Sequence, residues 1–67
     1  MLWLSDFILL INFDMYSFNI IDYKTKVEME TVDSIEVARN FWLAMGDFKI
    51  VQIEPHSDTC INVYIKR

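Results

Sequence analysis

The chain of 67 residues contains one cysteine, one histidine, one glycine and one proline. A single cysteine excludes an internal disulfide, and one cysteine with one histidine cannot supply the four ligands of a structural zinc site. The scarcity of glycine and proline excludes a flexible linker, and no internal repeat is visible. A chain this short is expected to form a single unit over residues 1–67, without a covalent or metal staple.

Basic residues are also scarce, because six Lys and Arg face ten Asp and Glu and leave a net charge of −4. This balance repels phosphate backbones and disfavours direct nucleic-acid binding. No basic residue precedes the first apolar stretch, which argues against a secretory signal. The longest purely apolar run, residues 7–11, is far shorter than the roughly 20 residues that span a bilayer. We therefore expect a cytoplasmic protein with no membrane partner, and one unpaired cysteine fits that reducing compartment.

Apolar side chains, by contrast, are abundant, since 54% of the residues are hydrophobic and 15% are aromatic. A domain of this size buries only about 60% of the surface that its unfolded chain exposes. Burial and conformational entropy then nearly balance. The composition therefore predicts a homodimer, formed either by an unpaired edge strand joining its symmetry mate or by an apolar N-terminal segment crossing to a second subunit.

One helix is predicted over residues 34–45. Asp33 is a suitable N-cap, and Glu36 three residues later completes a capping box. Gly46 follows the segment at the position where a left-handed backbone commonly ends a helix. Between these signals the apolar residues recur at helical spacing, at Ile35, Ala38, Phe41, Trp42 and Met45.

Strands are predicted on both sides of this helix. Residues 48–53 and 59–65 are rich in β-branched and aromatic side chains, and the segment 54–58, with its Pro, Ser and Asp, joins them as a hairpin turn. Before the helix, residues 23–30 alternate strictly between uncharged and charged side chains, which indicates one strand with a buried face and a solvated face. Residues 16–21 have similar character and could extend it.

The first segment is ambiguous because short apolar runs do not distinguish a strand from a helix. Residues 7–13 favour a strand through their Ile and Phe content, whereas Ser5 could cap a helix over residues 6–13. A third interpretation makes residues 1–14 an apolar arm outside a complete β-α-β-β core at 15–67.

Together these segments predict an α+β fold, in which a single helix packs on one face of a small antiparallel sheet in the order ββαββ, with the first element open. The predicted core is Phe18, Ile20, Val27, Met29, Ile35, Ala38, Phe41, Trp42, Met45, Ile50, Ile61, Val63 and Ile65.

Residues with chemical potential are few. His56, Ser57 and Asp58 are consecutive in the predicted turn, so their side chains diverge and cannot form a nucleophilic triad. Cys60 has no evident cation beside it except His56, which favours a structural thiol. The sequence therefore predicts no catalytic residues, no cofactor and no enzyme activity.

Partner contacts are the better interpretation of the remaining features. Acidic side chains gather where the predicted strand meets the helix, but their spacing matches no calcium loop, and acids near a helix N-terminus are stabilised by its dipole. Leu43 falls on the polar side of the helix, and the N-terminal segment is strongly apolar. The candidate partner-binding residues are Trp3, Phe7, Leu9, Glu28, Glu30, Glu36 and Leu43.

Excess apolar surface, acidic balance and absent chemistry point to a small acidic protein–protein interaction module with a protein partner. Such short chains without motifs are common among accessory and inhibitory proteins of phages and mobile elements, which act by occupying a partner surface. The alternative, a small nucleic-acid-associated regulator, requires a basic aromatic face. The cations Lys24, Lys26, Lys49, Lys66 and Arg67 are too few and too mixed with acids along the sequence to predict one.

Overall fold

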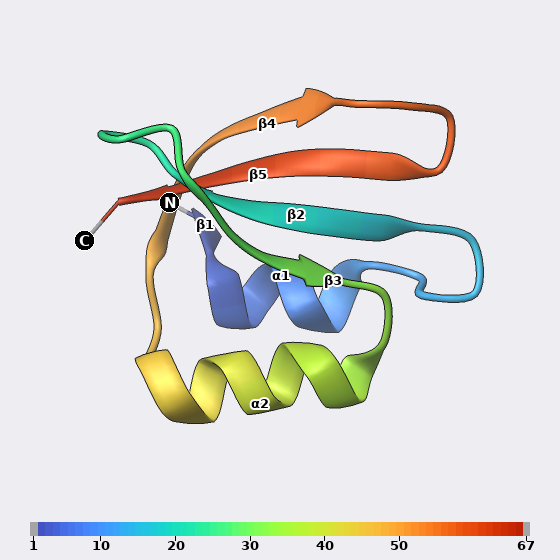
Figure 1. The fold of residues 1–67 in the computed structure, drawn as a ribbon. Helices are drawn as coiled ribbons and strands as arrows, with labels where there is room; N and C mark the ends of the chain where they lie inside the picture. The colour runs from blue at the N-terminus through green and yellow to red at the C-terminus, as the bar shows by residue number, and fades with distance from the viewer. Residues whose placement is uncertain (1, 67) are drawn as a thin grey trace.

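The computed structural model describes residues 2–66 and shows a mixed α+β fold with helices on one side of a sheet (Figure 1). The five strands of the sheet lie in the order β1-β4-β5-β2-β3. In chain order the elements are β1 (Leu2–Trp3), α1 (Leu4–Leu10), β2 (Ser17–Asp22), β3 (Glu28–Val32), α2 (Ile35–Met45), β4 (Lys49–Pro55) and β5 (Cys60–Lys66).

The sheet consists of two antiparallel hairpins joined side by side. Strands β2 and β3 form one hairpin and β4 and β5 form the other, while β2 pairs with β5 in parallel at the centre. Backbone hydrogen bonds from Ser17 N to Thr59 O and from Tyr23 N to Ile65 O, both 2.9 Å, mark the two ends of this parallel ladder. The prediction of a purely antiparallel sheet is therefore wrong. Helix α2 returns the chain to the end of the sheet where β3 began, so β4 runs in the same direction as β3. Their hairpin partners β5 and β2 therefore also run in the same direction and can pair in parallel.

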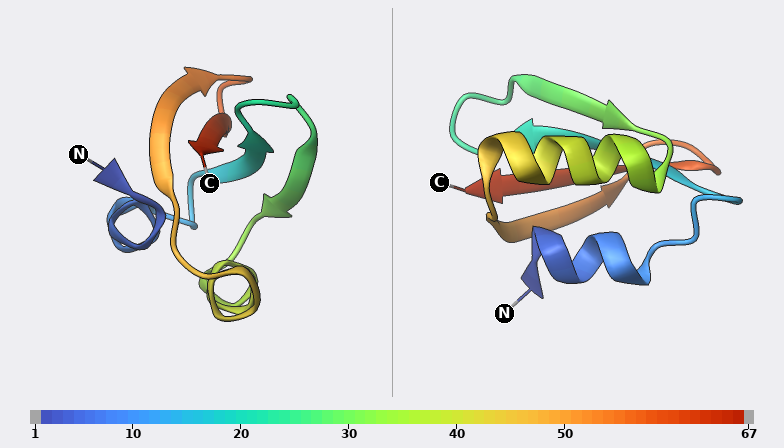
Figure 2. Two further views of the ribbon diagram at one scale, coloured as in Figure 1. Left: turned by 90° about the vertical axis from the view of Figure 1, so that its left-hand side faces the viewer. Right: turned by 90° about the horizontal axis from the view of Figure 1, so that it is seen from below.

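The first segment is a helix, so the preferred prediction of a strand is wrong. Leu4, Phe7 and Ile8 of α1 follow helical spacing and are buried. They belong to the main hydrophobic core. The interpretation of residues 1–14 as an arm outside the core is therefore also wrong for α1. The prediction of a single helix is therefore wrong: the structure has two helices, which lie side by side on one face of the sheet (Figure 2).

The long strand predicted around residues 23–30 is interrupted by a turn. The Asp22 carboxylate accepts hydrogen bonds from the backbone N–H groups of Lys24 at 2.9 Å and Thr25 at 3.1 Å. Lys26 has a φ of 63°, in the left-handed region. An Asp side chain that bonds to the backbone two residues onward is a typical turn former, and here it outweighs the alternating pattern.

Helix α2 and the second hairpin are confirmed, with two differences in detail. The predicted turn at 54–58 is shorter in the structure, because Glu54 and Pro55 belong to β4 and pair with Asn62 and Ile61 of β5. The other difference is at the cap of the helix. Ser34, not Asp33, is the N-cap, and its hydroxyl accepts a hydrogen bond from Val37 N at 3.2 Å. Gly46 ends the helix with a φ of 88°, and its N–H donates to Trp42 O at 2.8 Å. Both Asp33 and Ser34 are good capping types, and the hydrogen bond from Val37 identifies Ser34 as the residue that caps.

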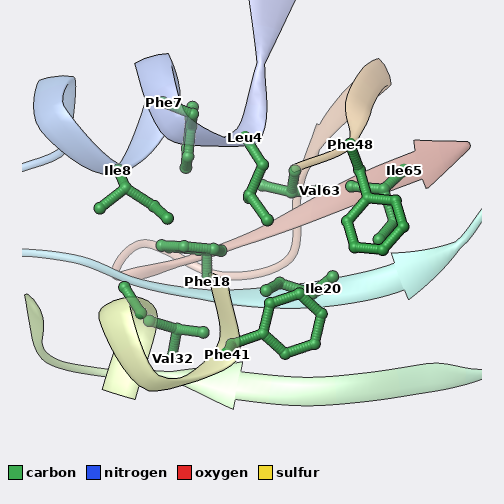
Figure 3. Close-up of a cluster of buried hydrophobic side chains, with 11 residues drawn as sticks. Leu4, Phe7, Ile8, Phe18, Ile20, Val32, Phe41, Phe48, Val63 and Ile65 are labelled. Atoms are coloured by element: carbon green, nitrogen blue, oxygen red, sulfur yellow. The ribbon is translucent and has the colours of Figure 1, made fainter. Parts of the chain in front are cut away.

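The core lies between the sheet and the two helices (Figure 3). The rings of Phe7 and Phe18 pack edge to face, with centroids 5.0 Å apart. Six predicted core residues are buried: Phe18, Ile20, Ala38, Phe41, Val63 and Ile65. Another three, Met29, Ile50 and Ile61, pack against the core while partly exposed. The prediction missed Leu4, Phe7, Ile8, Val32 and Phe48.

Four predicted core residues are instead exposed: Val27, Ile35, Trp42 and Met45. Val27 follows the turn after β2, where it no longer lies within a strand. Ile35 and Trp42 lie on the flank of α2 that faces α1, beside Ser5, Ile8 and Leu9, and not on the stripe that packs against the sheet. Within residues 2–66, neither helix has the length and apolar character needed to cross a membrane.

The membership of α1 in the core can be tested with two substitutions in the same helix. We expect Phe7→Ala to lower the free energy of unfolding by about 3–5 kcal/mol, because it removes a buried aromatic ring. Leu10→Ala should change it by less than about 0.5 kcal/mol, since Leu10 is exposed. Urea unfolding followed by circular dichroism measures both. Equal effects of the two substitutions would contradict the placement of α1.

Candidate functional site

A groove between α1 and α2 brings together two of the predicted partner-binding residues, Leu9 and Leu43. Their side chains remain 82% and 66% exposed, respectively, although both are large and apolar. The groove has a volume of about 340 Å³. Its lining is formed by Ser5, Ile8, Leu9, Ile35, Arg39, Trp42 and Leu43. The sequence identified both leucines but gave no reason to place them in one site.

Helical geometry explains why these side chains face each other. Successive helical residues are about 100° apart, so Leu9 lies next to the buried Ile8 around α1. On α2, Ile35, Arg39 and Trp42 are four and seven residues apart and share one flank. Ala38 and Phe41 point to the sheet and are buried. Each helix therefore buries one stripe against the sheet and presents a second apolar flank to the groove.

Asp47 joins the two helices at the Ser5 end of the groove. Its carboxylate accepts hydrogen bonds from the Ser5 hydroxyl at 2.6 Å and from the Ser5 backbone N–H at 3.0 Å. Ser5 lies in the first turn of α1, where backbone N–H groups have no partner within the helix. Asp47 thus caps α1 from just beyond the end of α2, across 42 positions of sequence. This cap was missed because a long-range cap has no local signature.

The same hydrogen bonds shift the pKa of Asp47. Burial raises the pKa of this carboxyl group, but the hydrogen bonds from Ser5 lower it. Further hydrogen bonds from the Phe48 backbone and the Trp42 side chain act in the same direction, so the pKa lies below its ordinary value of 3.8. The hydrogen bonds from Ser5 therefore favour the ionised form of Asp47.

A second surface gathers the lysines with aromatic rings at one end of the sheet. Lys26 Nζ lies 3.8 Å from the ring centroid of Tyr23 and 5.1 Å from that of Tyr64. Lys49 Nζ lies 5.9 Å from the Trp3 ring centroid. Lys66 borders two depressions, of which one is also lined by Lys24 and Asp22 and the other by Lys49 and Asp47. Every lysine of the chain thus lies in what we call the lysine–aromatic end: Trp3, Tyr23, Lys24, Lys26, Lys49, Tyr64 and Lys66.

The predicted acidic residues do not form one site. Glu28 accepts a hydrogen bond from the Thr31 hydroxyl at 2.7 Å, whereas Glu30 lines a depression beside α2. Glu30 pairs with Ile20 and Glu28 pairs with Ile21, so the pairing of β2 with β3 shifts by one residue between them. The strict alternation of side chains along this strand therefore fails at the shift. Glu36 is exposed in the first turn of α2. No three His, Cys, Asp or Glu side chains of residues 2–66 come together as a metal site.

Two further predicted candidates occupy other places. Phe7 is only 9% exposed and packs in the core, so it is not part of a binding surface. Trp3 is exposed on the short edge strand β1, beside Lys49.

Cys60 is half-buried on the sheet face opposite the helices, and its Sγ lies 3.5 Å from Asn19 Nδ2. The backbone N–H groups of His56 and Ser57 both donate to Cys60 O at 3.0 Å, which closes the turn between β4 and β5.

Comparison with known proteins finds no match to a protein-family model, to a curated protein or to a solved structure. The functional argument for this chain therefore depends on its own surfaces.

The role of Asp47 predicts a specific pH dependence. Because the pKa of Asp47 is lowered in the folded state, its ionised form stabilises the fold above the ordinary carboxyl pKa, and this stabilisation is lost as the pH falls through the lowered value. Asp47→Asn should therefore reduce the melting temperature at pH 7 and reduce it less below about pH 4. Thermal unfolding from pH 2 to pH 7 measures this difference. A constant difference across that range would contradict the assignment, and Asp58→Asn, in an exposed turn, is the control.

Proposed function

We propose that this protein is a small interaction module that binds another protein through the groove between α1 and α2. The observation that carries this proposal is the meeting of Leu9 and Leu43 in one groove, although both side chains remain largely exposed. Scattered exposed leucines are normal on a protein surface, whereas contiguous apolar patches mark interaction sites. The module acts by covering a surface of its partner, without catalysis.

The shape and chemistry of the groove favour an amphipathic helix of the partner as its occupant. A helix can place apolar side chains at positions i, i+3, i+4 and i+7 into a groove between two other helices. Full burial of a Leu side chain contributes about 1.5–3 kcal/mol. Arg39 lines the groove, Glu36 lies one turn from it on α2, and the Asp47 carboxylate lies at its Ser5 end. The charged side chain of the lining itself is Arg39, so a partner helix with an acidic side chain beside its apolar stripe would match it.

A more concrete form of this function is an accessory or inhibitory protein of a phage or mobile element, working in the cytoplasm. This form rests on the small size of the chain, its net charge of −4 and the absence of a catalytic constellation in its sequence. The groove supplies the physical means, since an inhibitor of this size can act only by occupying a site on a larger protein.

Substitutions in the groove test the proposed interaction. Leu9→Asp and Leu43→Asp should each weaken partner binding at least about tenfold, because each places a charge where an apolar contact forms. Val27→Asp is the matched control, since Val27 is an exposed apolar residue outside the groove. The partner is first isolated by affinity capture with the wild type, and the three variants are then compared with it by calorimetry. A partner that binds the groove variants and Val27→Asp equally would refute this site.

A second candidate function, binding of single-stranded nucleic acid, is favoured by the lysine–aromatic end. Single-strand binding combines cationic side chains with rings on which bases stack. Tyr23 and Trp3 are exposed at this surface, and all the lysines gather there although they are dispersed in the sequence.

Fluorescence anisotropy with a short single-stranded DNA tests this candidate. We expect Lys26→Gln and Lys66→Gln to reduce binding at low salt, with a shallower salt dependence. Arg39→Gln lies on the helical side and should leave binding unchanged. Equal loss in all three variants would indicate unspecific attraction, and no binding by the wild type would exclude the candidate.

A further inference from the structure

The outer edge of β4 is covered over only part of its length. Strand β1 pairs with β4 at Ile50 and Lys49. Beyond Ile50, no strand formed by residues 2–66 lies on the outer side of β4. The uncovered part is at the top of Figure 1, away from both helices. It carries two apolar side chains, Val51 and Ile53, which are 44% and 46% exposed.

The pairing with β5 determines which backbone groups face outward. His56 N donates to Cys60 O at 3.0 Å, just beyond the register pairs Pro55–Ile61 and Glu54–Asn62. In an antiparallel ladder, hydrogen-bonded and non-hydrogen-bonded pairs alternate. Glu54 and Gln52 therefore direct their backbone groups toward β5, whereas Ile53 and Pro55 direct theirs to the outer edge. The position of Pro55 agrees with this assignment, because proline has no N–H to donate to β5.

We propose that this edge pairs with β4 of a second copy of the chain, antiparallel and about a twofold axis at Ile53. Ile53 of each copy then donates its N–H to the carbonyl oxygen of Ile53 of the other copy, and the two sheets become continuous. A twofold interface uses the same patch on both chains. The exposed edge groups and side chain of Ile53 are covered in both copies together.

The charges of β4 favour a second copy in this register. With Ile53 opposite itself, Gln52 of one copy lies opposite Glu54 of the other, where an amide can donate to a carboxylate. Within one chain, Gln52 Nε2 already donates to Glu54 Oε2 at 3.3 Å, so the two groups have suitable reach. Centring the pair on Glu54 would oppose two carboxylates and is disfavoured. Strand β1 at one end and Pro55 at the other limit any further shift.

The oligomeric state and its dependence on this edge test the proposal. Sedimentation of the wild type across micromolar concentrations should show a monomer–dimer equilibrium. Ile53→Lys should weaken the dimer at least tenfold while circular dichroism shows a folded chain, because a lysine on an edge strand opposes strand pairing. Val27→Lys, near the opposite edge of the sheet, and Leu43→Asp, in the groove, should leave the dimer intact.

The register is tested by cross-linking in a Cys60→Ser background. In the proposed pairing, positions 52 and 54 form a non-hydrogen-bonded pair with Cα atoms about 4.5 Å apart, a distance that a disulfide can span. A mixture of Gln52→Cys and Glu54→Cys chains should therefore form a disulfide-linked heterodimer under mild oxidation, and neither variant alone should do so efficiently. A strictly monomeric wild type, a dimer insensitive to Ile53→Lys, or cross-linking of each variant only with itself would overturn the proposal. An edge that binds only an added extended peptide would also overturn it.

Discussion

The parallel pairing of β2 with β5 is the constraint on which the rest of the structure depends. It joins residues more than forty positions apart, such as Phe18 and Ile61, and makes these two strands the centre of the sheet. Their inward side chains, Phe18, Ile20, Val63 and Ile65, form the base of the core. The hairpin partners β3 and β4 then flank this pair, and α2 crosses from β3 to β4 on one face, while β1 covers one end of β4. One face is consequently apolar and covered, while the other remains half-exposed and polar.

The space beside α2 explains the position of α1 and the origin of the groove. One helix of 11 residues cannot cover the apolar face alone, so Leu4, Phe7 and Ile8 of α1 complete the core. The Asp47 carboxylate then fixes the start of α1 to the end of α2 through Ser5. Two helices joined at one end leave a groove along their length, and the flanks that cannot reach the sheet line it. The excess of apolar residues is thus a consequence of having two amphipathic helices in a very small protein.

The molecule separates three chemically different surfaces. The helical side carries an apolar groove, one end of the sheet gathers the lysines around aromatic rings, and the β4 edge exposes backbone groups with apolar side chains. The groove is formed by α1 and α2 and the uncovered edge by β4 beyond Ile50, so a protein partner in the groove and a second copy at the edge can bind together. The lysine–aromatic end contributes local positive charge to a chain whose net charge is −4.

The sequence by itself determined the features that depend on neighbouring residues: the α+β class, helix α2 with its Gly46 terminus, the β4–β5 hairpin, and the exposure of Leu43. It predicted less where contacts distant in the sequence compete with local pattern. Alternation over residues 23–30 continued through a turn that Asp22 forms, and the first turn of α1 takes a hydrogen-bond acceptor from the distant Asp47. Only the tertiary structure decided the parallel centre of the sheet, the meeting of the two leucines and the clustering of the lysines. Each of these brings together residues far apart in the chain, and no local periodicity or propensity encodes that proximity.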